Sequence, residues 1–218
     1  MNQEFTKDEL RELEKQLSHP NGEIGIEVGK TMNETNIGMT LNSIGFLELK
    51  KHNSVLELGH GNCGHLGKLL ESAQGIKYFG LEISETMLSE AKKLNADKEA
   101  EFKLYDGETI PYEDSTFDRI FSVNCIYFWS NPEKLMREIR RTLKSNGFCV
   151  LAYVNKDFAK NLPFVRDKFT LYDQADITNL AKKSDLEIVE IKELIEQVKS
   201  KTAQSVTRKY AMAKLKGL

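Results

Sequence analysis

The feature that most constrains this chain is the run VLELGHGNCGHL, in which three glycines follow an apolar stretch. Gly59, Gly61 and Gly64 have a G-x-G-x-x-G spacing, which between a buried strand and a helix leaves backbone N–H groups free to contact a ligand. Side chains at these positions would block the close approach of the backbone, so glycine is required there. The run therefore predicts a nucleotide-cofactor loop, and the alternative is a purely structural turn.

Sequence periodicity from residue 54 onward predicts an α/β fold built from βαβ units. Strand-like runs are expected at residues 54–58, 77–83, 101–105, 119–123 and 148–154. Helical periods lie between them at 66–73, 87–94 and 136–143, with Asn131-Pro132 opening the last helix and Gly147 closing it. After an irregular stretch, a helix from Asp176 and strands at 187–191 and 209–215 are expected. The alternation predicts a mostly parallel sheet with helices on both faces.

Residues 1–50 are expected to form a helical cap. Thr6 and Glu9 stand at capping-box spacing, before leucines that recur at helical intervals up to His19-Pro20. The glycine-punctuated stretch NGEIGIEVGK then leads into a second helical pattern from Ile37 to Ile44, which ends before Lys50. We therefore expect two helices with a glycine-rich lead-in before the second.

Composition and charge argue against several classes of protein. The 218 residues suit a single core, and a net charge of −2 gives no general attraction for polyanions such as nucleic acid. Three cysteines without paired spacing argue against a disulfide framework and against a zinc site. No run approaches the ~18 apolar residues that a membrane helix needs, and the first residues lack the pattern of a secretory leader. We therefore expect a soluble, cytoplasmic protein.

Two acidic residues stand where a bound nucleotide would need them. Glu82 ends the second strand, about 20 residues beyond the first glycine, where a carboxylate can accept hydrogen bonds from both ribose hydroxyls. Asp106, followed by Gly107, ends the third strand, where a carboxylate can accept from the exocyclic amine of adenine. The alternatives are a surface glutamate and a simple Asp-Gly turn. Because ligands of open α/β sheets bind at the carboxyl ends of the strands, the three features together favour a nucleotide site.

The sequence resembles a known family over residues 54–154. The runs VLELGHGNCG, GLEIS, LYDGETIPYEDSTFD and SVNCIYFWSNPEKLMREIRRTLKSNGFCVL are similar to the class I S-adenosylmethionine-dependent methyltransferases, nearest to the small-molecule branch that includes the quinone-biosynthesis C-methyltransferases. The resemblance implies a Rossmann-like α/β fold with a seven-stranded, mostly parallel sheet whose last strand is antiparallel. It implies one domain over 1–218: a cap at 1–50, a cofactor-binding core at 51–155, a substrate-side insertion at 156–175, and a helix with a strand pair at 176–218.

The resemblance also implies roles for individual residues around an S-adenosylmethionine cofactor. Glu57 and the loop residues Gly59, His60, Gly61 and Gly64 would hold the methionine part of the cofactor, and Glu82 would hold the ribose. Ile83 and Met87 would flank adenine, and Asp106 with Gly107 would contact its amine. Asn124 and Cys125 would border the sulfonium, and Tyr127 and Trp129 would face the substrate. The histidines His60 and His65 depart from the family pattern.

Methyl transfer from a sulfonium is an in-line displacement, so positioning is the main requirement and no catalytic residue is identified. If the acceptor needs a base, the nearby candidates are His60, His65 and Tyr127; no metal site is expected. Met32, Asn33 and Asn36 are candidates for closing over the cofactor, with helix capping as the alternative. The aromatic stretch 156–175 is a candidate wall of an apolar substrate pocket through Phe158, Leu162, Phe164, Phe169 and Tyr172, with loop packing as the alternative.

Three rival functions stay open. A nicotinamide-dependent oxidoreductase would use the same glycine loop and acidic residue, but the chain lacks room for a substrate domain. A nucleic-acid or protein methyltransferase would suit the tail from Lys199, which carries six basic residues and no acidic ones, although we interpret that charge as a solvated face. A catalytically silent cofactor-binding module is the third. We expect a small-molecule methyl acceptor and no nucleic acid; the oligomeric state is not determined.

Overall fold

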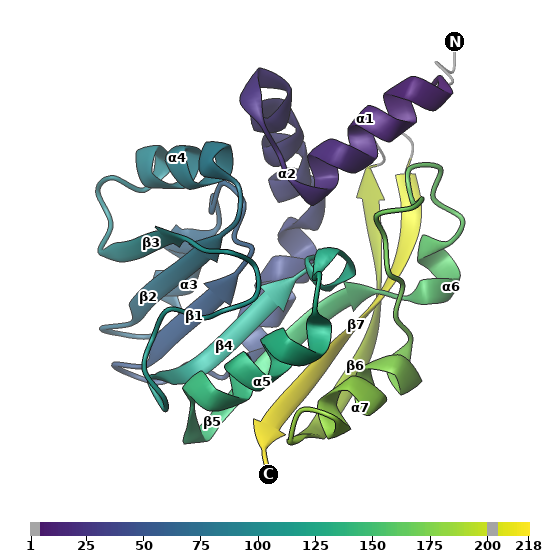
Figure 1. Ribbon diagram of the computed structural model, residues 1–218. Helices are drawn as coiled ribbons and strands as arrows, with labels where there is room; N and C mark the ends of the chain where they lie inside the picture. Colours follow the sequence, from purple (N-terminus) through teal and green to yellow (C-terminus); the bar gives the residue numbers. More distant parts are fainter. Residues whose placement is uncertain (1–4, 200–204) are drawn as a thin grey trace.

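The computed structural model describes residues 5–199 and 205–218, which form a seven-stranded sheet with helices on both faces (Figure 1). The strand order is β3-β2-β1-β4-β5-β7-β6. The strands are β1 (Ser54–Leu58), β2 (Lys77–Glu82), β3 (Ala100–Leu104), β4 (Phe117–Val123), β5 (Leu143–Val154), β6 (Leu186–Lys199) and β7 (Ser205–Gly217). Strands β1 to β5 pair in parallel, whereas β7 pairs antiparallel with both β5 and β6. The predicted fold is confirmed.

Strand order fixes where a ligand can bind. The chain runs outward from β1 through β2 to β3 and then returns to β4, so β1 lies between β2 and β4. Connections on the two sides of β1 therefore diverge, and a crevice opens at the carboxyl ends of the central strands. The glycine run follows β1 at this point.

Seven α-helices and one 3₁₀ segment accompany the sheet within residues 5–199. They are α1 (Lys7–Ser18), α2 (Gly22–Phe46), α3 (Leu66–Glu71), α4 (Glu85–Leu94), the 3₁₀ segment η1 (Ile126–Phe128), α5 (Pro132–Thr142), α6 (Lys156–Ala159) and α7 (Gln174–Lys182). None of the helices within the described residues has both the length and the apolar character to cross a bilayer.

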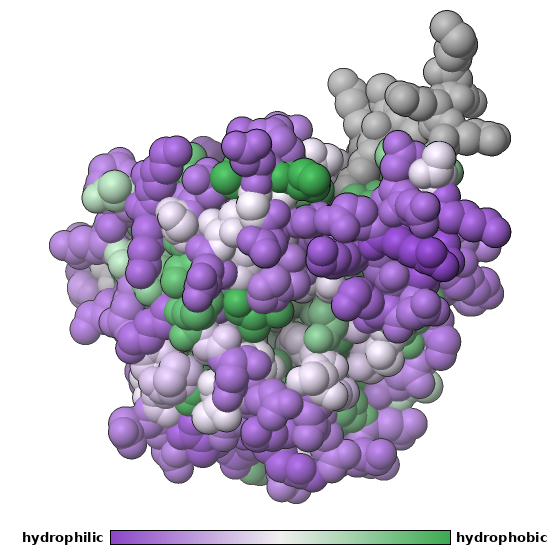
Figure 2. All heavy atoms as spheres, turned by 45° about the horizontal axis from the view of Figure 1, so that its top comes forward, coloured by the Kyte–Doolittle hydropathy of each residue, from purple (hydrophilic) through white to green (hydrophobic). Residues whose placement is uncertain are grey.

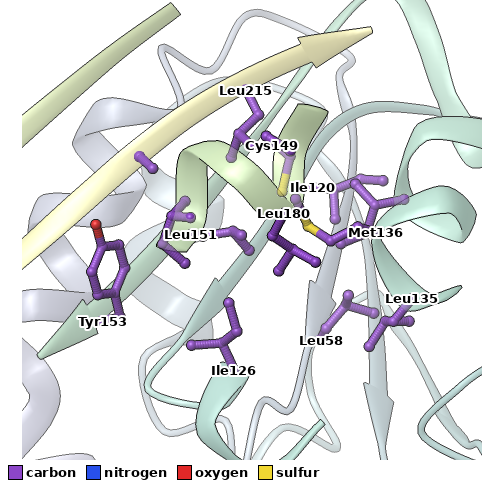
Figure 3. Packing of buried hydrophobic residues seen from close by; sticks show 14 of the residues in the cluster. Leu58, Ile120, Ile126, Leu135, Met136, Cys149, Leu151, Tyr153, Leu180 and Leu215 are labelled. Carbon is purple, nitrogen blue, oxygen red and sulfur yellow. The ribbon is translucent and has the colours of Figure 1, made fainter. Parts of the chain in front are cut away.

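Alternating side chains of the strands build two hydrophobic clusters, one on each face of the sheet. Val55 and Leu56 are neighbours in β1, yet Val55 belongs to the cluster that includes residues of α2, α3 and α4, and Leu56 to the cluster beneath α5 and α7. Figure 3 shows the second cluster, in which Ile120 and Cys149 of the sheet pack beside Met136 of α5 and Leu180 of α7. Burial on both faces explains why apolar residues occupy consecutive positions in the central strands, as Val55 and Leu56 do in β1.

Helix α2 differs from the sequence prediction, because residues 22–30 are its first turns and not an irregular lead-in. The glycines in this part of the helix allow close packing. A Cβ at Gly25 would lie 2.7 Å from the backbone carbon of Pro20, and one at Gly29 would lie 2.6 Å from the sulfur of Met87. These glycines allow Pro20, which follows α1, and Met87 of α4 to approach α2 closely. A sequence pattern cannot distinguish such a glycine from one in a turn.

Three further segment boundaries differ from the prediction. Helix α5 ends at Thr142 and Gly147 lies inside β5, where a Cβ would come within 2.9 Å of the carbonyl oxygen of Asp118 on β4. Helix α7 begins at Gln174, two residues before the predicted start, with Asp173 as its capping residue. Strands β6 and β7 extend well beyond 187–191 and 209–215, because their pairing continues through polar positions as far as Lys199 and Ser205.

We predict opposite effects on stability for two glycine substitutions in α2. Gly25→Ala should lower the free energy of unfolding by about 1–3 kcal/mol, because the new methyl group meets rigid backbone. Gly45→Ala should raise it by about 0.5–1 kcal/mol, because no atom lies within 4 Å of its Cβ position and alanine favours a helix. Chemical denaturation of both variants measures the difference. Stabilisation by both substitutions would contradict the close packing of Gly25.

Candidate functional site

A cavity of about 600 Å³ lies at the carboxyl ends of the central strands, between the sheet, the cap helices and the stretch after β5. Its size is within the range of small-molecule sites. In Figure 2, which looks more directly at this end of the molecule, hydrophobic residues gather around the centre of the face and hydrophilic residues surround them. The cavity therefore opens where the strand order predicts a ligand.

Most of the sequence-predicted site residues meet in this one cavity. The lining includes Glu57, Gly59, His60, Gly61, Glu82, Ile83, Met87, Asp106, Gly107, Asn124, Cys125, Tyr127 and Trp129. Gly64 is outside the lining, and a Cβ there would come within 2.9 Å of the Asn33 amide on α2. The third glycine thus allows α2 to pack against the loop, as the first two allow the loop to turn.

The glycine loop turns sharply after β1. Gly59 and Gly61 have φ angles of +73° and +56°, in the left-handed region that favours glycine. A Cβ at Gly59 would overlap the thiol of Cys125, which donates a hydrogen bond to the Gly59 carbonyl at 3.2 Å. The ends of β1 and β4 are therefore in direct contact at the bottom of the crevice.

Glu82, at the end of β2, accepts three backbone hydrogen bonds with its buried carboxylate. Oε2 accepts from Gly61 N–H at 2.9 Å, while Oε1 accepts from Ile83 N–H at 2.8 Å and from Ser84 N–H at 3.1 Å. Each carboxylate oxygen can accept two hydrogen bonds, so Oε2 retains capacity for a hydroxyl donor. Glu82 thus holds the glycine loop against β2 while lining the cavity.

Asp106 follows β3 and is exposed at the cavity edge. Its Oδ1 accepts from the backbone N–H groups of Glu108 and Thr109 at 2.8 and 2.7 Å. The hydrogen bond from Thr109 N–H, followed by that from Glu108 N–H, holds the pKa of Asp106 below its ordinary value. The carboxylate is therefore ionised at neutral pH, and both of its backbone hydrogen bonds fall on Oδ1.

The segment after β4 brings an amide, a thiol and a phenol to the cavity. Asn124 has a φ of +58°, which asparagine tolerates better than most residues. Tyr127 Oη donates to Asn124 Oδ1 at 3.0 Å and accepts from the backbone N–H of Val154. Burial raises the pKa of Tyr127 and raises that of Cys125 to about 12. Both groups are therefore neutral at physiological pH.

His60 lines the cavity and has one hydrogen-bond partner among the described residues. Its Nδ1 lies 2.7 Å from the carbonyl oxygen of Gly61, which makes Nδ1 the protonated nitrogen. Nε2 is buried without a hydrogen-bond partner among the described residues, and the ring packs on Phe102 and above Gly80. Burial lowers the pKa of His60, so the ring is neutral.

Glu57 anchors a buried polar group behind the loop. Its Oε2 lies 2.8 Å from His65 Nε2 and accepts from Tyr78 Oη at 2.5 Å, while the thiol of Cys63 is 3.2 Å from Tyr78 Oη. Ligand atoms of Glu57, Cys63 and His65 lie within 4.8 Å of one another, close enough to hold a metal ion. Because these atoms already pair by hydrogen bonds, we assign no metal there, and the expectation of no metal site stays a prediction.

The pKa values of the buried pair shift in opposite directions. Burial alone would raise the pKa of Glu57, but the charge of His65 and the hydrogen bonds from His65 and Tyr78 lower it. Burial alone would lower the pKa of His65, but the charge and hydrogen bond of Glu57 raise it. Both shifts favour the ionised form of the pair, in which a positive imidazolium lies against a carboxylate and each ion stabilises the other.

An apolar wall closes the cavity on the side of β4 and β5. Leu162, Phe164 and Phe169 line it as expected, whereas Phe158 and Tyr172 do not. Phe169 packs edge-on against Phe128, with ring centroids 4.6 Å apart, and 5.8 Å from the ring of Tyr127. Phe128 also lines the cavity.

Helix α2 crosses above the crevice. Met32, Asn33 and Asn36 lie in the middle of this helix, so the helix-capping alternative for the two asparagines is wrong, and all three residues line the cavity. Asn36 Oδ1 accepts from Asn124 Nδ2 at 3.0 Å and from Arg208 Nη1 at 2.8 Å. One cap residue therefore contacts both the end of β4 and strand β7.

Arg208 is a site residue that the sequence did not identify. The basic tail was interpreted as a solvated face, yet Arg208 and Lys214 are buried, at 7% and 5% exposure, and Arg208 lines the cavity. The interpretation is wrong for these two residues, and Lys201 lies outside the described residues. Pairing of Glu196 with Arg208 across the β6–β7 register is the sequence signal that would have placed them together.

Comparisons with known proteins agree with this geometry. Residues 56–151 match the family model described as "Methyltransferase domain". Phosphoethanolamine N-methyltransferase 2 of Caenorhabditis elegans is 28% identical over 130 residues, which are 58% of this chain and 29% of that protein. The uncharacterized methyltransferase YdaC of Bacillus subtilis is 29% identical over 115 residues, 53% of this chain and 62% of that protein. The chain spans less than two thirds of the length of either relative.

A solved structure shows the same fold. The YcgJ protein from Bacillus subtilis superposes with a TM-score of 0.66 at 16% sequence identity, covering 83% of this chain and 99% of that one. At this identity the likeness extends to the fold alone.

The Glu57–His65 pair predicts a pH dependence of stability. Because folding raises the His65 pKa, the pair's contribution is complete below the ordinary value of 6.5 and is lost as the pH rises through the folded value. At pH 6, the free energy of unfolding of His65→Gln should be about 3 kcal/mol lower than that of the unsubstituted protein. This difference in unfolding free energy between the two proteins should become smaller above pH 6.5, as measured by chemical denaturation of both proteins at a series of pH values. A gap that stays constant with pH would show that His65 is not charged in the folded protein.

Proposed function

We propose that this chain, whose residues 56–151 match a methyltransferase domain, transfers a methyl group from S-adenosylmethionine to a small molecule. The observation that carries the proposal is the convergence of Gly59, Glu82 and Asp106 on one cavity from the ends of β1, β2 and β3. These groups are separated along the chain, and parallel pairing of the three strands brings them to one edge of the sheet.

The cofactor would lie along the ends of β1 to β4. Glu82 would accept from the ribose hydroxyls with its remaining Oε2 capacity, and Asp106 Oδ2 would accept from the adenine amine. Ile83 and Met87 would flank the adenine ring, with Gly107 beside it. Glu57, Gly59, His60 and Gly61 would surround the methionine part, with Gly64 supporting the loop from behind, and Asn124 and Cys125 would border the sulfonium.

Catalysis would come chiefly from positioning. S-adenosylmethionine supplies an activated methyl group, and holding the acceptor in line with it can lower the barrier by roughly 7–11 kcal/mol. None of the three named bases is well placed. Tyr127 uses its hydroxyl as donor and acceptor within the protein, His60 Nε2 is buried beside Phe102, and His65 Nε2 is paired with the Glu57 carboxylate. We therefore assign a proton transfer to none of them, and Tyr127 and Trp129 would act as walls for the acceptor.

The small-molecule class of the acceptor rests on two observations. The cavity is enclosed by the cap and by an apolar wall, and the relatives include phosphoethanolamine and ajmaline N-methyltransferases. A sterol 4-C-methyltransferase also matches, at 29% identity, so the relatives do not assign the methylated atom. As part of the same proposal we place the protein in the cytoplasm, because all three cysteines are free.

Replacement of Asp106 tests the cofactor assignment. Asp106→Asn keeps an oxygen for the two backbone N–H groups but can turn an amide N–H₂ toward the adenine amine, so two donors would face each other. We predict that the Kd for S-adenosylhomocysteine rises about tenfold, measured by calorimetric titration. Glu108→Gln is the matched control, because Glu108 lies two residues after Asp106 but outside the cavity lining. The Kd of this variant for S-adenosylhomocysteine should stay unchanged.

If the Kd for S-adenosylhomocysteine is the same for Asp106→Asn and for the unsubstituted protein, adenine does not bind beside Asp106. An equal loss in both variants would indicate a general effect of surface charge.

A further inference from the structure

Among the cavity-lining residues that the structure describes, Arg208 is the only lysine or arginine. It extends from β7, beyond the last β5–β7 pair of Val154 with Tyr210, and therefore lies next to the substrate-side wall. Its side chain is 9% exposed. A buried guanidinium that faces a cavity is uncommon unless it is paired, because an isolated buried charge is costly.

The pairing of Arg208 leaves part of the guanidinium available. Glu196 Oε1 accepts from Nε at 2.9 Å and from Nη2 at 2.6 Å, and the carbonyl of Thr35 accepts from Nη2 at 2.9 Å. Nη1 donates to Asn36 at 2.8 Å and carries a second N–H for which the described residues show no partner. Glu196 is outside the cavity lining, so a ligand would meet the guanidinium and not the carboxylate.

Acidic groups are confined to the other half of the cavity. Glu57, Glu82 and Asp106 line it from the ends of β1, β2 and β3. The lining residues at the end of β5 and in the segments that follow β4 and β5 are neutral and largely apolar: Tyr127, Val154, Leu162, Phe164, Phe169 and Leu171. The acceptor half therefore combines an apolar wall with a single cationic donor.

From this asymmetry we propose that Arg208 selects a methyl acceptor that carries a carboxylate on an apolar body. The proposal rests on the methyltransferase function above and names the class of its acceptor. A carboxylate on the free Nη1–H would gain a charge-assisted hydrogen bond, which is stronger than a neutral one. Burial of both groups in the cavity would strengthen their attraction, while an ammonium would be repelled.

Matched ligands of one shape test the selection. With the protein saturated by S-adenosylhomocysteine, calorimetry would give the Kd values of 3-phenylpropionate, 3-phenylpropanol and 3-phenylpropylamine. We expect the carboxylate to bind about tenfold or more tightly than the amine, with the alcohol between them. The double variant R208Q/E196Q, which leaves no unpaired charge, should bind the carboxylate and the alcohol equally.

Lys214→Gln is the matched control, because Lys214 is a buried cation of the same strand, is paired with Glu48 at 2.6 Å, and lies outside the cavity lining. It should keep the preference for the carboxylate, and thermal unfolding would check that each variant folds.

Four results would overturn the assignment. The first two are an amine that binds as tightly as the carboxylate and the absence of binding by all three compounds. The other two are a preference for the carboxylate that persists in R208Q/E196Q, and a double variant that keeps this preference but no longer binds S-adenosylhomocysteine. The last would assign Arg208 to the cofactor. Failure of the unsubstituted protein to bind S-adenosylhomocysteine would instead reject the proposed function itself.

Discussion

The site depends on the hydrogen bonds that the carboxylate of Glu82 accepts. By accepting from the N–H groups of Gly61, Ile83 and Ser84, it joins the glycine loop after β1 to the turn that begins α4. Ser84 in turn donates its hydroxyl to the carbonyl of Pro20, which connects this turn to the cap. Three segments far apart in sequence are thus linked through Glu82 and Ser84, and the hydrogen bonds to the buried Glu82 side chain compensate for its desolvation. Glu82 Oε2 remains able to accept from a ligand.

A second polar contact holds the cap in place above the cavity. The side-chain oxygen of Asn36 accepts from both Asn124 and Arg208, so α2 is joined to the end of β4 and to β7 through one amide. Helix α2 also needs glycines for its close approach to Pro20 and Met87. Since the cap, the glycine loop and the C-terminal hairpin share these contacts, a ligand that enters the cavity touches elements from the whole length of the chain.

Sequence patterns predicted what depends on local chemistry. Strand periodicity located β1 to β5, and the strand ends placed Gly59, Glu82 and Asp106 together, because parallel strands bring their carboxyl ends to one edge. Patterns failed where packing between distant elements decides. Glycines in α2 and Gly147 were interpreted as breaks, although they serve close approach, and Arg208 resembled a solvated charge because its partner Glu196 lies on another strand. The unpaired Nε2 of His60 likewise depends on Phe102 and Gly80, which its own motif does not reveal.

We propose that this cavity holds S-adenosylmethionine with its ribose on Glu82. The decisive measurement is calorimetric titration of the unsubstituted protein and of Glu82→Gln with S-adenosylhomocysteine and with NAD. We predict that S-adenosylhomocysteine binds, that NAD does not, and that the substitution weakens binding by about tenfold, because an amide replaces one charged acceptor of the ribose hydroxyls. Binding of NAD alone, or affinity for S-adenosylhomocysteine that is unchanged by Glu82→Gln, would contradict it.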